Sequence, residues 1–320
     1  MTFAARGLLV SLAFFAVIYC ALSVGVALFW QAARRWAGIG AAKFPGLLFG
    51  LRISSFAISL VITLFLTFPS FWMMERHSLD EDGGTFVLAG CAVVILAAGV
   101  FRFLRDHLRT SRAVRAWGIR GEVASPGLAR TQRAPMWSVE VPLRASAGAP
   151  ALILVGLRRP RVMISDAALA ALSEDELQVA MRHEVGHRRS WDNLKKILIS
   201  ATPFPGMNQL EKAWREAAEL AADDAAVENR QEALDLAAAL IKLSRCSKRP
   251  AEPALASGLM CGSLSITTRV ERLLAWRNSS DRRRAWPWAL SLVLALTFAI
   301  VTHYDASLAL THRLTELLVP

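Results

Sequence analysis

The chain has 320 residues, 54% of them hydrophobic, and a formal net charge of +11 at pH 7. Its mean hydropathy of +0.37 is too high for one ordinary soluble domain. Because the apolar residues are also concentrated in a few long segments, the composition indicates a membrane protein with an attached soluble part.

Four apolar segments are candidates for membrane-spanning helices. The first, residues 8–30, contains no charged residue, and as a helix it would be roughly 34 Å long, enough to cross a bilayer core. A secretory signal peptide is the competing interpretation, but this run is too long for one and no A-x-A cleavage site follows it. We expect the other spans at residues 46–68, 86–104 and 286 to about 301. Arg52, near one end of the second span, is expected to extend its charge to the membrane surface.

Charges between the spans predict the orientation of the chain. The loop after the first span carries Arg34, Arg35 and Lys43, whereas the loop after the second span is mainly acidic. Clusters of arginine follow the third span and precede the fourth. By the positive-inside rule, residues 105–285 form a cytoplasmic domain and both termini lie outside. The basic clusters lie beside the membrane, which favours contacts with the lipid bilayer over direct binding of nucleic acid.

Short strands are predicted near the start of the cytoplasmic domain. Residues 137–142 are one candidate, and residues 151–155 and 161–164 are apolar runs with β-branched residues, separated by Gly156 and Pro160. Either of the last two could offer a sheet edge on which an extended peptide lies as an added strand. A plain core hairpin is the alternative. With the helices that follow, the sequence predicts an α+β domain of about 160 residues, enough for one compact core.

The segment from Met181 to His187 contains an H-E-x-x-H motif, with His183, Glu184 and His187 as its polar residues. Residues four apart lie on one face of a helix, so both imidazoles can reach one metal ion while Glu184 lies beside them. Such a run also occurs by chance, and histidines on helices are often core residues rather than ligands. The motif therefore predicts a zinc hydrolase site that needs further ligands.

The helix that carries this motif has a clear beginning and a clear core face. Ser173 and Glu176 have the spacing of a capping box, which predicts a helix starting at this point. Leu177, Met181 and Val185 recur at a spacing of four residues and form a core stripe next to the histidines. We therefore expect the histidine face to be half buried, with Gln178, Arg182, Gly186 and Arg189 on the far side.

A second helix, residues 207–227, supplies two carboxylates one helical turn apart. Glu219 is the candidate for the third metal ligand, and Asp223 is expected to accept a hydrogen bond that orients a ligand histidine. Glu216 is the alternative ligand, and a solvated acidic face is the alternative interpretation of the whole cluster. Asp192, which follows the motif closely, is expected to contact a ligand histidine or to cap the next element.

Three further segments complete the domain. Residues 197–205 are apolar but interrupted by two prolines, which predicts a loop or a dip into the membrane surface. Residues 266–276 form a helix that leads to the basic cluster before the fourth span. Residues 228–243 form an amphipathic helix whose predicted core stripe is Leu234, Ala237, Ala238 and Ile241.

The predicted site is suited to metal-assisted hydrolysis. Zn²⁺ bound by the two histidines and Glu219 would leave one position open for water, which Glu184 would deprotonate. Residues 188–302 contain no tyrosine and no further histidine, so a different group must stabilise the tetrahedral intermediate. Arg269 is the candidate for this role, and a position on a helix surface is its alternative.

The chain resembles the BlaR/MecR-type integral membrane metallopeptidases, an antirepressor family. The resemblance covers nearly the whole chain, including three spans, a zinc domain and a fourth span. It implies a gluzincin-type metalloprotease domain in a bacterial cytoplasmic membrane, with Glu184 as the catalytic carboxylate. It also implies cleavage of a cytosolic regulator, or of the protein itself, in signal transduction. The segments that carry it are residues 156–165, 173–177, 183–189, Asp192-Asn193 and 219–223.

Two features separate this chain from the β-lactam receptors of that family. It contains no S-x-x-K motif and ends at Pro320, so a penicillin-binding sensor domain is not expected and a sensing partner becomes possible. An HtpX-like quality-control protease shares the H-E-x-x-H motif and is the alternative enzyme. A membrane receptor or scaffold with a structural zinc site is the alternative from another class, although such a site would need four protein ligands.

Overall fold

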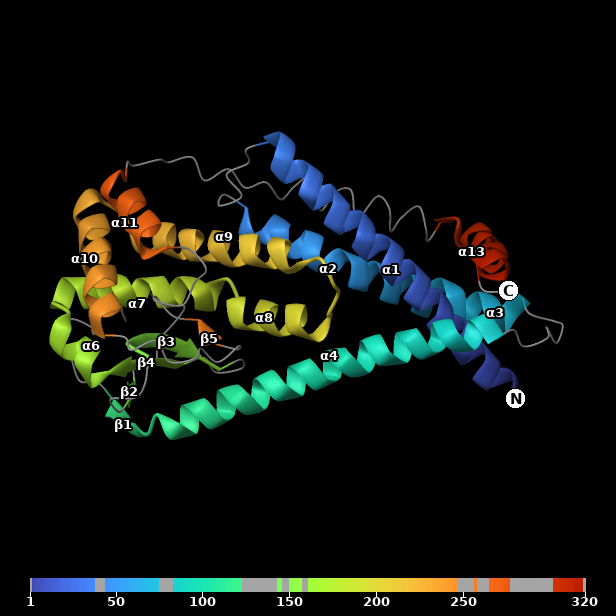
Figure 1. The fold of residues 1–320 in the computed structure, drawn as a ribbon, viewed down its shortest axis with the longest axis horizontal. Helices are drawn as coiled ribbons and strands as arrows, with labels where there is room; N and C mark the ends of the chain where they lie inside the picture. Colours follow the sequence, from blue (N-terminus) through green and yellow to red (C-terminus); the bar gives the residue numbers. More distant parts are fainter. Residues whose placement is uncertain are drawn as a thin grey trace.

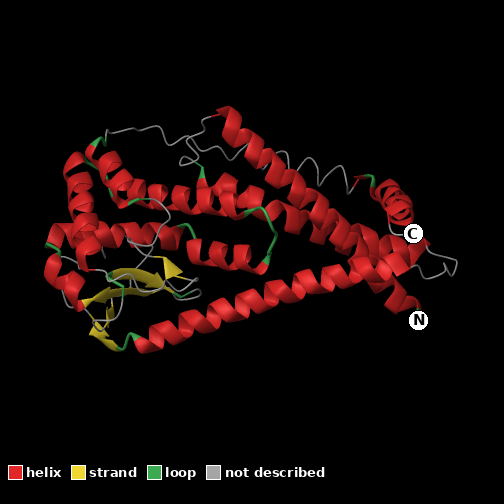
Figure 2. Cartoon of the chain, viewed as in Figure 1, coloured by secondary structure: helices red, strands yellow, loops and turns green. Residues whose placement is uncertain are grey.

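The computed structural model describes residues 2–37, 44–74, 83–122, 143–145, 150–156, 161–246, 256–257, 265–276 and 302–318. Within these residues the protein is mainly helical and contains one small sheet (Figure 2). Long helices form one end of the molecule, and the sheet lies among shorter helices at the other end (Figure 1).

Three helices in the described part of the chain are long and apolar enough to span a membrane. They are α1 (Phe3–Ala37), a continuous helix formed by α2 (Pro45–Ile62), η2 (Thr63–Thr67) and α3 (Phe68–Met74), and α4 (Gly83–Ala116). Each contains one of the first three predicted spans and extends beyond it. α4 continues past the predicted end of its span and leads directly into the domain. The fourth predicted span lies outside the described residues.

The C-terminal helix α13 (Tyr304–Leu318) packs at the far end of the long helices, opposite the sheet (Figure 1). Here η2 has π-helical hydrogen bonding, in which the Phe68 N–H donates to the Thr63 carbonyl. Pro69 has no N–H, so it cannot pair with the Phe65 carbonyl four residues before it. The Tyr304 hydroxyl donates to that carbonyl at 2.9 Å. α13 thus supplies a hydrogen-bond donor to the Phe65 carbonyl, which lipid chains could not do.

The described strands form one sheet in the order β1-β2-β4-β3-β5. The strands are β1 (Ile119–Glu122), β2 (Leu143–Ala145), β3 (Leu152–Val155), β4 (Arg161–Ser165) and β5 (Ala256–Ser257). β2 and β4 are parallel, and the other pairs are antiparallel. The two strands predicted around residues 151–164 are confirmed as the β3–β4 pair. The strand predicted at residues 137–142 lies outside the described residues.

The prediction that β3 or β4 offers an open sheet edge is wrong for most of their length. β4 pairs with β2 on one side and β3 on the other, and β5 pairs with β3 at Leu154 and Val155. Both faces of the β3–β4 pair are also covered. Leu152, Leu154 and Ile164 face the main core, whereas Ile153 and Met163 face Trp117 at the end of α4. The β3–β4 pair is therefore largely buried inside the domain.

The described residues of the domain contain six helices: α6 (Asp166–Ala171), α7 (Glu174–Arg189), α8 (Asp192–Ala201), α9 (Asn208–Ala226), α10 (Arg230–Cys246) and α11 (Ile266–Leu274). The main core lies between β3, β4 and the helices α6, α7, α10 and α11. The core stripe predicted for α10 is wrong at Leu234 and Ile241, which are exposed, and correct at Ala237, which is buried. The buried residues of α10 are Ala233, Leu236, Ala237, Ala239, Leu240 and Leu243.

The segment predicted as a loop around residues 197–205 is partly helical. α8 continues to Ala201, and only the residues after it form a connection to α9. This connection contacts the long helices: the Tyr19 hydroxyl donates to the carbonyls of Thr202 and Pro203. Gly99 of α4 lies against the Ala201 carbonyl so closely that a Cβ there would overlap it. α8 therefore reaches from the domain to the middle of α1 and α4, where Tyr19 and Gly99 lie.

Candidate metal centre

α7 and α9 carry the candidate metal ligands and pack directly against each other. The predicted capping box at the start of α7 is confirmed, with Ser173 and Glu176 bonded reciprocally. Gly186 was expected on the far side of α7, but it is buried against α9. A Cβ at Gly186 would lie 3.3 Å from the Ala222 Cα, so the small residue allows the close approach of the two helices. This approach brings Glu219 opposite the histidines.

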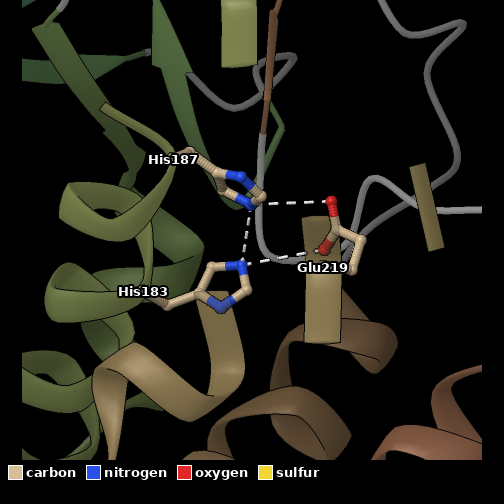
Figure 3. Close-up of side chains that lie close together, drawn as sticks. All are labelled: His183, His187 and Glu219. Atoms are coloured by element: carbon tan, nitrogen blue, oxygen red, sulfur yellow. Dashed lines mark hydrogen bonds and ion pairs between the residues drawn. The ribbon is translucent and has the colours of Figure 1, made fainter. Parts of the chain in front are cut away.

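His183, His187 and Glu219 offer ligand atoms that all lie within 4.8 Å of one another. The Nε2 atoms of the two histidines are 3.1 Å apart. Glu219 Oε2 lies 3.7 Å from His183 Nε2, and Oε1 lies 3.5 Å from His187 Nε2 (Figure 3). Ligand atoms about 2.0–2.2 Å from a tetrahedral Zn²⁺ ion are roughly 3.3–3.6 Å apart. The donor set and its spacing therefore fit one metal ion.

Each histidine is held by a carboxylate on its other ring nitrogen. His183 Nδ1 lies 3.0 Å from Asp223 Oδ1, and His187 Nδ1 lies 2.7 Å from Asp192 Oδ2. An ionised carboxylate only accepts, so the Nδ1–H of His187 donates to Asp192, and the Nδ1 atom of His183 faces Asp223 at ion-pair distance. The lone pair of each Nε2 is then free for a metal ion. The structure thus places Asp223 and Asp192 where the sequence predicted them.

The site is more deeply buried than the predicted half-buried face. His183 and Glu184 are 0% exposed, His187 is 1% exposed and Glu219 is 4% exposed. Burial lowers the pKa of His183 to about 3, which keeps its imidazole neutral as a metal ligand must be. Burial raises the pKa of Glu219 to about 7, against the opposing effect of His187 and Arg269. A buried carboxyl that ionises with difficulty fits a site in which a cation compensates its charge.

The pKa of His187 shows the same surplus of negative charge. Burial disfavours the imidazolium form, but the charges of Glu219 and Asp192 outweigh it and raise the pKa of His187. The nearby carboxylate of Glu184 acts in the same direction. The raised pKa of His187 thus reflects the excess of negative charge that a metal ion bound here would neutralise.

Arg269 reaches this centre from α11 instead of lying on a helix surface. It is 3% exposed, and its guanidinium donates to both oxygens of Asp223 at 2.8 and 2.5 Å. Its Nη1 also lies 3.1 Å from Glu219 Oε2. Although burial disfavours the charge of Asp223, Arg269 and His183 hold its pKa below the usual range. Arg269 thus contacts both Glu219, a candidate metal ligand, and Asp223, the carboxylate beside His183.

Glu216, the alternative third ligand, does not approach the histidines. It pairs with Lys212 at 3.8 Å on the partly exposed side of α9. From the sequence, Arg269 was predicted only to stabilise the tetrahedral intermediate. Its contacts with Asp223 and Glu219 were not predicted. Its position in the sequence gave no signal of these contacts, which depend on the packing of α11.

A comparison with protein families agrees with this site. The family model of the BlaR1 peptidase M56 matches residues 85–273, which are 189 of the 320 residues of the chain. The chain belongs to the M56 peptidase family. The M56 match begins in α4 and ends in α11, so it includes every helix that carries a residue of the candidate metal centre. No curated protein matches the chain.

Membership of the M56 family confirms the resemblance to BlaR/MecR-type membrane metallopeptidases that the sequence showed. It agrees with the apolar helices, which make the chain a membrane protein. The chain is therefore a membrane protein of a metallopeptidase family, with a buried group of two histidines and one glutamate that could hold the metal ion.

Proposed function

We propose that the chain is a membrane-bound zinc endopeptidase of the gluzincin type that cleaves a cytosolic regulatory protein, or its own chain, in signal transduction. The observation that carries this proposal is the convergence of His183, His187 and Glu219 with both imidazoles held at Nδ1 by carboxylates. This arrangement supplies three protein ligands and leaves a tetrahedral ion one open position, which distinguishes a catalytic site from a structural one.

The residues of the centre have separate roles in hydrolysis. His183, His187 and Glu219 would hold the zinc ion, which would lower the pKa of a water molecule and polarise the substrate carbonyl. Glu184 would serve as the general base for the attacking water and then as the general acid for the leaving amine. Asp223 and Asp192 keep the two imidazoles in one tautomer and one orientation. Arg269 holds Glu219 and Asp223 in place, and its charge also favours negative charge developing nearby.

The sheet supports the chain itself as one possible substrate. Proteins commonly bind an extended peptide as an added strand at a sheet edge. In the described residues, Ala256 and Ser257 occupy that position beside β3. They belong to the stretch between α10 and α11, close to Arg269 in the sequence. A segment of the same chain therefore already lies where a peptide could pair.

Metal content and substrate identity test the proposal together. We expect the purified full-length protein to contain one zinc ion per chain, measured by atomic emission, and His187→Ala to contain none. Proteomes of cells carrying the native or the Glu184→Gln chain should differ in fragments of one or a few cytosolic proteins. A native protein without stoichiometric metal would contradict the proposed function.

The orientation in the membrane is part of the proposal. We expect the metal centre on the cytoplasmic side of a bacterial inner membrane, with both termini outside, because arginines follow the third span. A reporter fused after Arg120 should therefore show cytosolic activity. A reporter placed after Asp82, in the acidic loop, serves as the control and should show external activity. The reverse pattern would overturn the charge argument and exclude a cytosolic substrate.

A further inference from the structure

We propose that Tyr19, Arg52 and Asp106 are positioning residues of the metal centre, because through α8 they fix Asp192 and with it the ring of His187. The inference rests on the proposed function, since it concerns the same centre. It adds a physical connection between the membrane-spanning helices and the metal ligands.

The C-terminal end of α8 is capped by side chains from two membrane-spanning helices. The last carbonyls of a helix have no partner within it. Arg52 of α2 donates to the Thr202 carbonyl at 2.7 Å and to the Ile199 carbonyl at 3.4 Å. Tyr19 of α1 donates to the carbonyls of Thr202 and Pro203 at 3.2 and 3.1 Å. The end of α8 is therefore bonded to both helices.

The third membrane-spanning helix holds the same end of α8. Ser200 donates to Asp106 Oδ2 of α4 at 2.6 Å, and Asp106 is 4% exposed. About two turns earlier on α4, Gly99 lies in contact with the Ala201 carbonyl. α1, α2 and α4 thus each supply one polar side chain to the same short segment.

Arg52 also joins the beginning of α9 to this junction. The prediction that Arg52 extends to the membrane surface is wrong, because its side chain is 1% exposed. Its Nε donates to Glu211 Oε1 at 3.0 Å, and the Glu211 side chain is only 9% exposed. Both charges are buried, so each depends on the other and on the carbonyls around it. Glu211 lies on α9, the helix that carries Glu219.

The other end of α8 holds the metal centre. α8 has 10 residues and begins at Asp192, whose carboxylate accepts from His187 at 2.7 Å. Asn193, the next residue, donates to the carbonyls of Leu154 and Gly156 and fixes this end to β3. A helix of this length is about 15 Å long and stiff along its axis. A displacement of the junction therefore moves Asp192 relative to His187.

A matched pair of variants tests this connection in the full-length protein. The double variant Arg52→Gln with Glu211→Gln removes both charges together, so neither remains buried alone. We expect its dissociation constant for Zn²⁺ to rise about tenfold, as for other changes behind a ligand histidine. Tyr19→Phe keeps the ring and loses the one hydroxyl proton that Thr202 and Pro203 share, and should raise the dissociation constant about threefold. Competition with a chelator measures the dissociation constants of both variants for Zn²⁺.

Tyr304→Phe is the control. Like Tyr19, Tyr304 donates to a backbone carbonyl, but its acceptor is Phe65, at the part of the α2–α3 helix that is far from α8. Tyr304→Phe should leave zinc affinity and the absorption spectrum of the Co²⁺-substituted protein unchanged, whereas the junction variants should shift that spectrum. Arg52→Lys, which keeps a positive charge beside Glu211, should lose less zinc affinity than the double variant. If the junction variants lower the melting temperature but change neither affinity nor spectrum, the residues are only structural. If the double variant does not fold, the zinc affinity and Co²⁺ spectrum of Tyr19→Phe test the proposal. A native protein without metal would instead contradict the proposed function.

Discussion

Glu184→Gln is expected to retain the metal ion and to reduce peptide hydrolysis by a factor of about 10²–10⁴, the usual contribution of a general base. Glutamine has nearly the shape of glutamate, so the packing around this fully buried side chain is preserved. It cannot accept the proton of the attacking water, however, and the nucleophile is no longer generated. Zinc content by atomic emission and cleavage of the target in membranes measure the two effects separately.

Glu174→Gln is the matched control for this experiment. Glu174 lies in the first turn of the same helix and is exposed. The same substitution there should leave both zinc content and cleavage unchanged. If Glu184→Gln cleaved the target at the native rate, the assignment of the base would be wrong. If the native chain transmitted its signal with no cleavage at all, a scaffold with a structural zinc site would explain the protein better.

Arg269→Met is expected to lower the free energy of unfolding of the metal-free protein by about 3–5 kcal/mol. The substitution removes the partner of two buried carboxylates, Asp223 and Glu219, and leaves their charges without compensation. Added Zn²⁺ should restore part of this loss, because a dication at Glu219 replaces the lost positive charge. Thermal unfolding in detergent, with and without zinc, measures both quantities.

Arg272→Met, on the same helix, provides the comparison. Arg272 pairs with Asp224 at 2.6 Å, but both side chains are well exposed. An exposed pair contributes about 0.2–1 kcal/mol, so the loss should be small and independent of zinc. Equal losses in the two variants would show that Arg269 does not compensate buried charge. A loss of kcat alone, with native stability and zinc affinity, would favour the role in stabilising the intermediate.

The part of the site that local spacing determines could be predicted from the sequence. The pairing of His183 with His187 follows from the period of the helix. Glu219 could be proposed as the third ligand because Glu219 and Asp223 repeat the same spacing on a second helix. Asp192 is five residues from its partner, so chain geometry alone brings it near. The capping box of α7 was equally predictable, because all its groups lie within one helical turn.

The contacts that depend on tertiary packing could not be predicted. Hydropathy detects a charge such as Arg52 inside an apolar segment, but it does not reveal a partner 159 residues away, as Glu211 is. Gly186 has no side chain, so the helical pattern gave no sign that its backbone contacts Ala222. The alanine-rich sequence of α10 fits two neighbouring stripes, and the difference depends on which helices cover it.

The near-complete burial of the histidines has a kinetic consequence. Under the proposed function, a peptide bond can reach His183 and His187, both at most 1% exposed, only after the surrounding segments separate. Turnover then follows the fraction of molecules in such an opened form, and the apparent kcat/KM is the intrinsic constant multiplied by that fraction. An input that shifts this equilibrium changes the rate of proteolysis even when the affinity for zinc and the chemistry of the centre stay constant.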